Sequence, residues 1–312
     1  MKKIFLFLFA TALTATLFTA CNNSKSGGGS DVVEMKLNLQ KGKTYTYSTK
    51  TNMNMDMQMM GKQVNTVGNV DFAFKMQVEN VDAEHNYHFT SSYDAIRFKM
   101  NAMGMDMGYD SKNVGDTVGE NMMSGMLRKV FGSMVGKSFH MIMTPKGEVL
   151  KVEGLKDLVE SMESSINISE QMRASMKKQM EQSFNEDQIK QSFAQGFYIY
   201  PDKALKVGDS WNKNFDKDMN NIKMNQDVTF TVKDINSSTV VLELSGKLKS
   251  SSVPGQDSVK IKMELSGDEK GTMEMDRATG MIRQGNIDMD MKMSAMGNPM
   301  TMKVKTVIEA KE

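Results

Sequence analysis

The stretch TNMNMDMQMM, residues 51–60, places a methionine on every second position from residue 53 to residue 59. The residues between these methionines are asparagine, aspartate and glutamine. Side chains on a β-strand point alternately to the two faces of a sheet, so a period of two gives one apolar and one polar face. The stretch therefore predicts a long β-strand with one buried face.

The same alternation covers most of the chain outside its middle. It recurs in residues 45–59, 64–78, 96–107, 228–232, 240–244, 259–265, 287–293 and 300–308. Short segments rich in glycine, proline, asparagine and aspartate separate these runs, as turns do. We expect an α+β fold that is mainly antiparallel β, a curved meander sheet resembling a half barrel with one solvated face.

The middle of the chain changes to helical spacing. Apolar residues recur every three or four positions in residues 123–135, 155–162, 169–180 and 185–196. One hairpin interrupts this pattern, because SFHMIM and EVLKV flank the turn sequence Thr144-Pro145-Lys146-Gly147. We expect a helical insert at about residues 120–196 within a β-rich domain of residues 32–312.

A weak internal repeat favours a duplicated β unit around this insert. Residues 39–45 match residues 205–211 as L-x-x-G-x-x-aromatic, and residues 78–82 match residues 232–236. Residues 96–100 and 259–263 form a third pair in the same order. Chance is the alternative, because such patterns arise easily in a strand-rich chain.

The N-terminus carries an export signal. Two lysines precede a short apolar run, and small residues precede Cys21, the single cysteine of the chain. LFTAC resembles the lipobox of bacterial lipoproteins, in which the thiol is lipidated. We expect a signal peptide at residues 1–20 and a flexible tether at residues 21–31, because NNSKSGGGSD is polar and glycine-rich.

Three segments carry a family resemblance. YPDKALKVGDSW, FHMIMTPKGEVLKVEGL and MEMDRATGMIRQGNIDM resemble uncharacterised lipoproteins of Bacteroidetes-type bacteria, a domain of unknown function. This resemblance implies no activity. At the level of fold, a curved sheet with helices on one face is similar to the lipoprotein carriers LolA and LolB, and such a likeness does not confer function.

The methionines allow two interpretations. Thioethers suit Cu(I) or Ag(I), and M-x-M spacing repeats here. Methionine also fills irregular apolar space, and on a strand both sulfurs of M-x-M lie on the face that must be buried. We prefer the apolar interpretation, since methionine also fills the helical stripes. The alternative Cu(I) ligands are Met53, Met55, Met57, His140, Met141 and Met143.

A methionine-lined concave sheet can also hold a ligand. Such surfaces adapt to ligands of varied shape. If the helices leave the hollow open, a lipid or another hydrophobic molecule can occupy it, and if they fill it the same residues are core. The candidate ligand-binding residues are Met53, Met55, Met57, Met59, Met103, Met105, Met107, Met289, Met291 and Met293.

Catalytic chemistry has little support. No histidine follows His140, so GDSW at residues 208–211 lacks the later histidine of the GDSL-type esterases that it superficially resembles. Metalloprotease, nucleophile-elbow, dithiol and phosphate-loop motifs are absent. A calcium-like run from Asp216 to Asp227 lacks the glycine and glutamate that an EF-hand loop needs. We expect no enzyme and no cofactor.

These observations predict a non-enzymatic cell-envelope lipoprotein. We expect a lipid anchor in the outer membrane and a domain that faces the periplasm, with surface exposure left open. The leading function is binding of a lipid or another hydrophobic ligand in a methionine-lined groove. A structural or protein-interaction role with a solid core and a Cu(I)/Ag(I)-binding role are the alternatives. A net charge of +1 without a basic cluster excludes a nucleic-acid partner.

Overall fold

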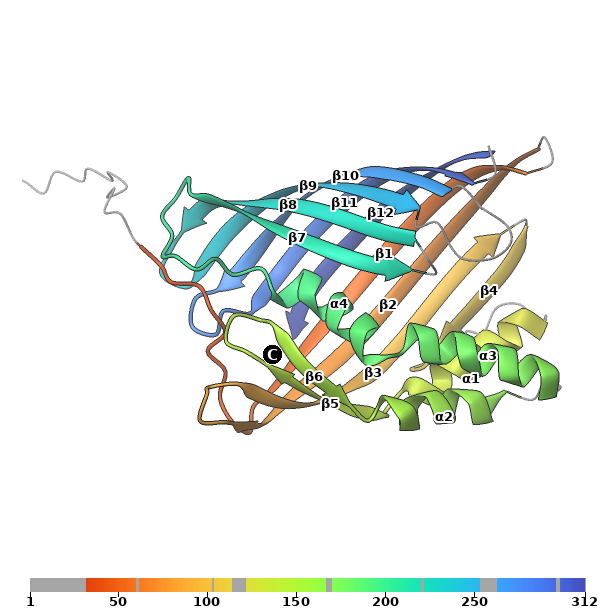
Figure 1. Cartoon of the computed structure of the whole chain (residues 1–312), viewed down its shortest axis with the longest axis horizontal. Coiled ribbons are helices and arrows are strands. Elements are labelled where there is room, and N and C mark those ends of the chain that lie inside the picture. Colours follow the sequence, from red (N-terminus) through yellow and green to blue (C-terminus); the bar gives the residue numbers. More distant parts are fainter. Residues whose placement is uncertain are drawn as a thin grey trace, which may run out of the picture. The chain divides into compact units, whose positions relative to one another are not determined.

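The alternating stretches form one antiparallel sheet that curves into an open half barrel, as the period of two predicts (Figure 1). The computed structural model describes residues 32–311, apart from residues 60–61, 103, 114–121, 167–169, 220–221, 253–262 and 296–297. The strands are β1 (Thr44–Met59), β2 (Lys62–Val81), β3 (Tyr87–Ala102), β4 (Met105–Asp110), β5 (Ser138–Met143), β6 (Val149–Glu153), β7 (Ser210–Met219), β8 (Ile222–Ile235), β9 (Thr239–Ser252), β10 (Met263–Asp276), β11 (Ile282–Ala295) and β12 (Asn298–Lys311). The predicted signal peptide, Cys21 and tether lie outside the described residues.

The strand order brings the first and last strands together in the middle of the sheet. It runs β6-β5-β3-β2-β1-β12-β11-β10-β9-β8-β7, and β4 pairs with the part of β3 that β5 leaves free. β6 and β7 are therefore the two ends of this order, and β4 is a further edge strand beside β3. The long pairing of β1 with β12 joins residues 46–57 to residues 300–311, which are more than two hundred positions apart in the sequence.

Four helices lie in the predicted insert. They are α1 (Met122–Met134), α2 (Leu155–Ser165), α3 (Glu170–Ser183) and α4 (Glu186–Phe197). The apolar stripe of α2 is buried as its spacing predicts, through Leu155, Leu158, Val159 and Met162. The Asn185 side chain caps α4 by accepting a hydrogen bond from the Gln188 N–H at 2.9 Å.

Helix α4 contacts both end strands of the sheet (Figure 1). At its first turn, the Val152 N–H of β6 donates to Glu186 Oε1 at 3.2 Å. At its last turn, Gln195 Nε2 donates to Gln226 Oε1 of β8 at 3.0 Å. The helix thus bridges the gap between the two ends and covers part of the concave face.

The internal repeat is present in the backbone. Gly42 and Gly208 both have positive φ, and their N–H groups donate to Val78 O and Val232 O at 2.7 and 2.9 Å. The next register shift falls just after Val78 in β2 and just after Val232 in β8. Each copy therefore begins with the same turn and the same bulged second strand.

The third proposed match of the repeat is not supported by the one residue that can be compared. Residues 96–100 lie in β3, the third strand of the first copy, residues 259–262 lie outside the described residues, and Met263 begins β10, the fourth strand of the second copy. The two stretches share only the alternation of any half-buried strand. The hairpin β5–β6 instead corresponds to β10–β11, and each hairpin turn holds a glycine with positive φ, Gly147 and Gly280.

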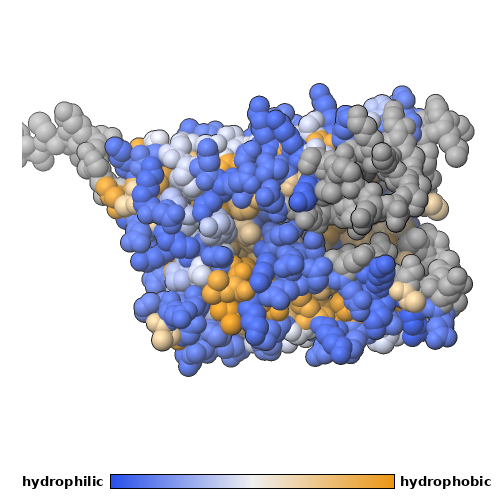
Figure 2. Space-filling model, in the orientation of Figure 1, coloured by the Kyte–Doolittle hydropathy of each residue, from blue (hydrophilic) through white to orange (hydrophobic). Residues whose placement is uncertain are grey.

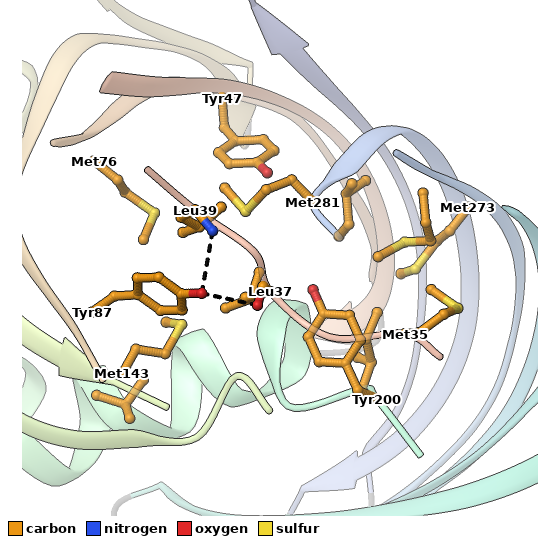
Figure 3. Close-up of a cluster of buried hydrophobic side chains, with 14 of the residues drawn as sticks. Met35, Leu37, Leu39, Tyr47, Met76, Tyr87, Met143, Tyr200, Met273 and Met281 are labelled. Atoms are coloured by element: carbon orange, nitrogen blue, oxygen red, sulfur yellow. Dashed lines mark hydrogen bonds between the residues drawn. The ribbon is translucent and has the colours of Figure 1, made fainter. Parts of the chain in front are cut away.

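An N-terminal strap, residues 32–40, fills one end of the half barrel (Figure 3). Its alternate side chains Val33, Met35, Leu37 and Leu39 are buried. The backbone–backbone hydrogen bonds of the strap go to loops: the Leu37 N–H donates to Pro145 O and the Asn38 N–H to Thr279 O, both at 2.8 Å. We did not predict this segment, although the alternation of apolar and polar residues in 33–39 could have indicated it.

Tyr87 fixes the strap from the sheet side (Figure 3). Its hydroxyl donates to Leu37 O at 3.0 Å and accepts from the Leu39 N–H at 3.2 Å. A buried hydroxyl and two backbone groups are satisfied in this way, so the strap can enter an apolar core without unpaired polar groups. The strap end of the half barrel is therefore a solid core.

We predict that Leu37→Ala lowers the free energy of unfolding by about 2–5 kcal/mol, because Leu37 is 1% exposed and a large cavity would remain. Urea unfolding of both proteins measures this difference. Val32→Ala is the matched control, since Val32 is 58% exposed in the same strap and should cost less than about 0.5 kcal/mol. Equal effects of the two substitutions would show that the strap is not part of the core.

Candidate functional site

The concave face of the sheet is covered at one end and partly open at the other. At the strap end, side chains such as Met76, Val78, Phe89, Val232 and Leu242 are at most 2% exposed. Further along the same strands, many concave-face positions are only half-buried, although Ile96, Phe98, Leu248 and Met291 are buried. The half-buried positions include Thr51, Met53, Met55, Met57, Thr66, Val70, Met100, Met107, Leu265, Ile287, Met289, Met293, Met300, Met302, Val304 and Thr306.

An apolar hollow of about 250 Å³ lies where the two parts meet. Its floor is the concave face and one wall is α4. Its lining is dominated by aromatic and branched side chains, Tyr47, Phe72, Phe74, Tyr93, Phe193, Phe197, Ile282 and Ile308, with Thr49, Ser192 and Gly196. Hollows of this composition suit an apolar ligand.

Aromatic contacts hold the wall of the hollow against its floor. The Phe193 ring of α4 lies 5.4 Å from the Phe74 ring of β2 and 6.4 Å from the Phe139 ring of β5, between centroids. Phe197 packs edge-on against Tyr47 at 6.1 Å. Such pairs stabilise beyond their buried area, so α4 is fixed here by side-chain packing.

The Tyr47 hydroxyl lies at this hollow and makes no hydrogen bond with the described residues. Burial raises its pKa well above the ordinary value, and the nearby Ile282 backbone acts in the opposite direction without reaching hydrogen-bond geometry. A buried hydroxyl without a partner costs free energy. Tyr47 therefore stays protonated, as one polar group in an apolar lining.

The strand register brings the predicted methionines together on the concave face. Met55 is opposite Met302, which is opposite Met291, and Met57, Met300 and Met293 form a second row. Met53 and Met289 flank Val304 in the next row. Met105 and Met107 share this face on β4, and Met59 holds the equivalent register position on β1. Met103 lies outside the described residues, and a ligand role for the set stays a prediction.

Sequence reasoning missed further methionines of this face, among them Met224 of β8. Met100, Met300 and Met302 have the same alternation as their neighbours, so period two could have found them. The proposed Cu(I) ligands, by contrast, are not brought together. Met141 and Met143 are buried in the core, whereas His140 points to the opposite face of β5 and is exposed.

The convex face carries charged and amide side chains. Asn65 donates to Asn54 at 2.8 Å and to Asp56 at 2.9 Å, and Lys305 lies 3.8 Å from Asp288. A hollow of about 490 Å³ over β9–β12 is lined mostly by such residues, including Lys247, Lys249, Asp268, Asp290, Lys292 and Lys303. The mixed charges indicate a solvated surface. Figure 2 views the opposite side, which carries the helices, and shows an apolar region there with hydrophilic residues around it.

The GDSW segment is a structural element. Gly208 has a φ of 90°, and Trp211 stacks on Phe230 while its Nε1 donates to Ile199 O at 2.7 Å. The Ser210 hydroxyl faces Thr231 at 2.8 Å on the exposed side.

In the calcium-like run, Asp216 accepts from Asn225 at 2.7 Å, and the middle of the run lies outside the described residues. Within the described part of the chain, histidine, cysteine and carboxylate side chains form no group of three that could hold a metal ion.

One polar chain crosses the concave face. Gln195 of α4 donates to Gln226 Oε1 of β8, and Gln226 Nε2 donates to Glu269 Oε2 of β10 at 2.5 Å. Gly246 of β9 lies between them, and a Cβ there would meet Glu269 Oε2 at 2.8 Å. Burial raises the pKa of Glu269, and the Gln226 hydrogen bond partly opposes this shift.

Residues 84–282 match the model of a family of unknown function, DUF6263. The chain belongs to this family. No curated protein matches the sequence. The resemblance to LolA and LolB stays a prediction of the sequence.

Three solved structures are similar in part. The first, described as lipid–protein interactions in lipovitellin, is 6% identical with a TM-score of 0.46, and the match covers 88% of this chain and 26% of that one. The translocator domain of the autotransporter NalP from Neisseria meningitidis is 6% identical with a TM-score of 0.34, over 88% and 90% of the chains.

The third is the COG4313 outer membrane channel from Pseudomonas putida F1, which is 7% identical with a TM-score of 0.26, over 88% and 97% of the chains. All three TM-scores are below 0.5, so these likenesses carry no functional inference. Among the described helices, none has the length and the apolar run that are needed to cross a membrane.

We predict that Glu269→Gln removes the loss of folding stability that ionisation of this carboxyl causes as pH rises. A carboxyl with a raised pKa in the folded state stabilises the fold fully below its unfolded pKa and less as pH rises through its folded pKa. The difference in unfolding free energy, variant minus wild type, should therefore grow with pH and then level off. Urea unfolding from about pH 4 to about pH 8 measures it. Parallel profiles of the two proteins would contradict the burial of this carboxyl.

Proposed function

We propose that this chain is a non-enzymatic lipoprotein of the cell envelope that holds a lipid acyl chain in its concave trough. The trough consists of the apolar hollow beside α4 together with the half-buried methionine rows. The proposal depends on one observation: other segments of the chain cover only part of the concave face. The strap and α4 bury one end, α1 and α2 bury Ile96 and Phe98 of β3, and most of the remaining apolar positions are half-buried. An apolar surface of this extent is typical of a binding site.

The methionine lining supports a ligand whose shape varies. Methionine side chains are unbranched and have three rotatable bonds, so they adjust to the bends of an acyl chain at low cost. The polar convex face supports the same proposal. Because the convex side chains are charged or amide groups, the apolar side chains of the strands lie on the concave face. Cys21 would be the lipid attachment site and would anchor the domain in the outer membrane, on the periplasmic side, through the predicted tether.

We predict that the double substitution Met53→Asn and Met55→Asn weakens binding of an apolar ligand about tenfold or more, because it removes apolar area from the trough. Fluorescence of N-phenylnaphthylamine, and its displacement by phospholipid, measures the affinity in the full chain carrying Cys21→Ser. Asn52→Gln with Asn54→Gln is the matched control, since these residues alternate with the methionines on the convex face. No probe binding by the unsubstituted trough would contradict the proposal.

A second candidate function is binding of Cu(I) or Ag(I), and the register supports it. Met55, Met302 and Met291 are direct cross-strand neighbours, and so are Met57, Met300 and Met293. Neighbouring Cβ atoms in antiparallel sheets are about 5 Å apart, and concave curvature brings the side-chain ends closer still. Thioethers gathered in this way suit soft monovalent ions.

We predict for this candidate a saturable Ag(I) complex that is lost when the six methionines of the two rows become leucine. Leucine keeps the apolar surface, so binding of N-phenylnaphthylamine should persist in the variant. Titration followed by native mass spectrometry measures metal stoichiometry. Unchanged silver binding in the variant, or none in the wild type, would remove these rows as a metal site.

A further inference from the structure

Glu269 is an acidic side chain on an apolar surface. It occupies a concave-face position of β10, opposite Gly246 of β9 and Met289 of β11. Among the concave-face positions of the described strands, it is the single acidic residue. Placing a carboxylate on an apolar surface costs folding free energy unless the carboxylate is paired, so the presence of Glu269 here needs a physical explanation.

The described residues donate a hydrogen bond to only one of the two carboxylate oxygens of Glu269. Gln226 donates to Oε2, and no hydrogen bond from the described residues reaches Oε1. Among the side chains that the structure describes, no lysine, arginine or histidine acts on the Glu269 carboxylate. Gly246 leaves the room that this arrangement needs, since any side chain there would crowd Oε2. Gln226 therefore holds one carboxylate oxygen, Oε2, and leaves the other, Oε1, available to a ligand.

The nearest charges on the packed elements do not neutralise it. Lys213 of β7 faces the concavity, but its Nζ lies 3.9 Å from the centre of the Tyr198 ring. Its charge interacts with Asp202 and Lys146 rather than with Glu269. Helix α4 approaches through Gln195, which is neutral. The described side chains therefore supply no cation to Glu269.

The free carboxylate lies within reach of the hollow beside α4. From Ile308 in the floor of the hollow to Glu269 is four residues along the strands and two strands across. Strand geometry makes this about 16 Å. Thr306, Ile287 and Gly271 lie on the way and are half-buried, so their surface is open to a chain lying on the sheet.

We propose that the ligand of the trough is a cationic amphiphile, with an amine head group on Glu269 and an apolar tail directed to the hollow beside α4. This inference rests on the proposed function, because it needs an open trough. The amine would donate to Oε1, while Gln226 holds Oε2. Charged hydrogen bonds are the stronger kind, so the head group contributes selectivity and the methionine surface contributes general affinity.

The test compares a primary alkylamine, alcohol and carboxylate of one chain length, each kept below its micelle concentration. Displacement of N-phenylnaphthylamine from the full chain carrying Cys21→Ser gives the three affinities. We expect the amine to bind at least about tenfold tighter than the alcohol, and the carboxylate to bind weakest. Glu269→Gln should remove the preference for the amine and leave the affinity for the alcohol in place.

Glu274→Gln is the matched control, because Glu274 lies on the convex face of the same strand and hydrogen-bonds to Gln284. It should keep the preference for the amine. Equal binding of amine and alcohol by the wild type would overturn the head-group inference while leaving the trough intact. Failure of all three amphiphiles to bind would overturn the trough as well. The wild-type comparison needs no variant, so it stands even if Glu269→Gln does not fold.

Discussion

An apolar sheet face has to be covered, and the rest of this structure depends on how far the cover extends. The strap supplies four buried side chains at one end, and α4 adds an aromatic wall beside them. Beyond them, most concave positions are half-buried, and methionine is the most frequent residue among them. The two interpretations of the sequence, filled core and open groove, therefore each describe one end of the same half barrel.

The internal repeat explains why the cover is incomplete. In the second copy, β12 follows the last hairpin and pairs with both β11 and β1. In the first copy, the chain after β6 forms helices, and α4 takes the place between β6 and β7. A helix cannot continue the backbone ladder, so the gap is bridged by side chains. The sheet is not closed along this line, and α4 covers the gap between its two ends.

Much of the architecture could be predicted from local pattern. Period two predicted β1, β2 and β12, helical spacing predicted the buried stripe of α2, and the repeated glycine turns predicted the duplication. The rest depends on distant contacts. The β1–β12 pairing has no local signal, and the strap alternates like a strand but pairs with loops. The methionine face followed from alternation, whereas Glu269 belongs to no motif and is recognised only by its apolar surroundings.

The central claim is that the methionine end of the concave face holds an apolar molecule. Native mass spectrometry of the full chain carrying Cys21→Ser, purified from the periplasm without detergent, tests it most directly. The account predicts a reproducible adduct of lipid or amphiphile mass that disappears on solvent extraction. A bare protein mass, together with no uptake of added phospholipid, would contradict the account and leave the half barrel as a structural domain.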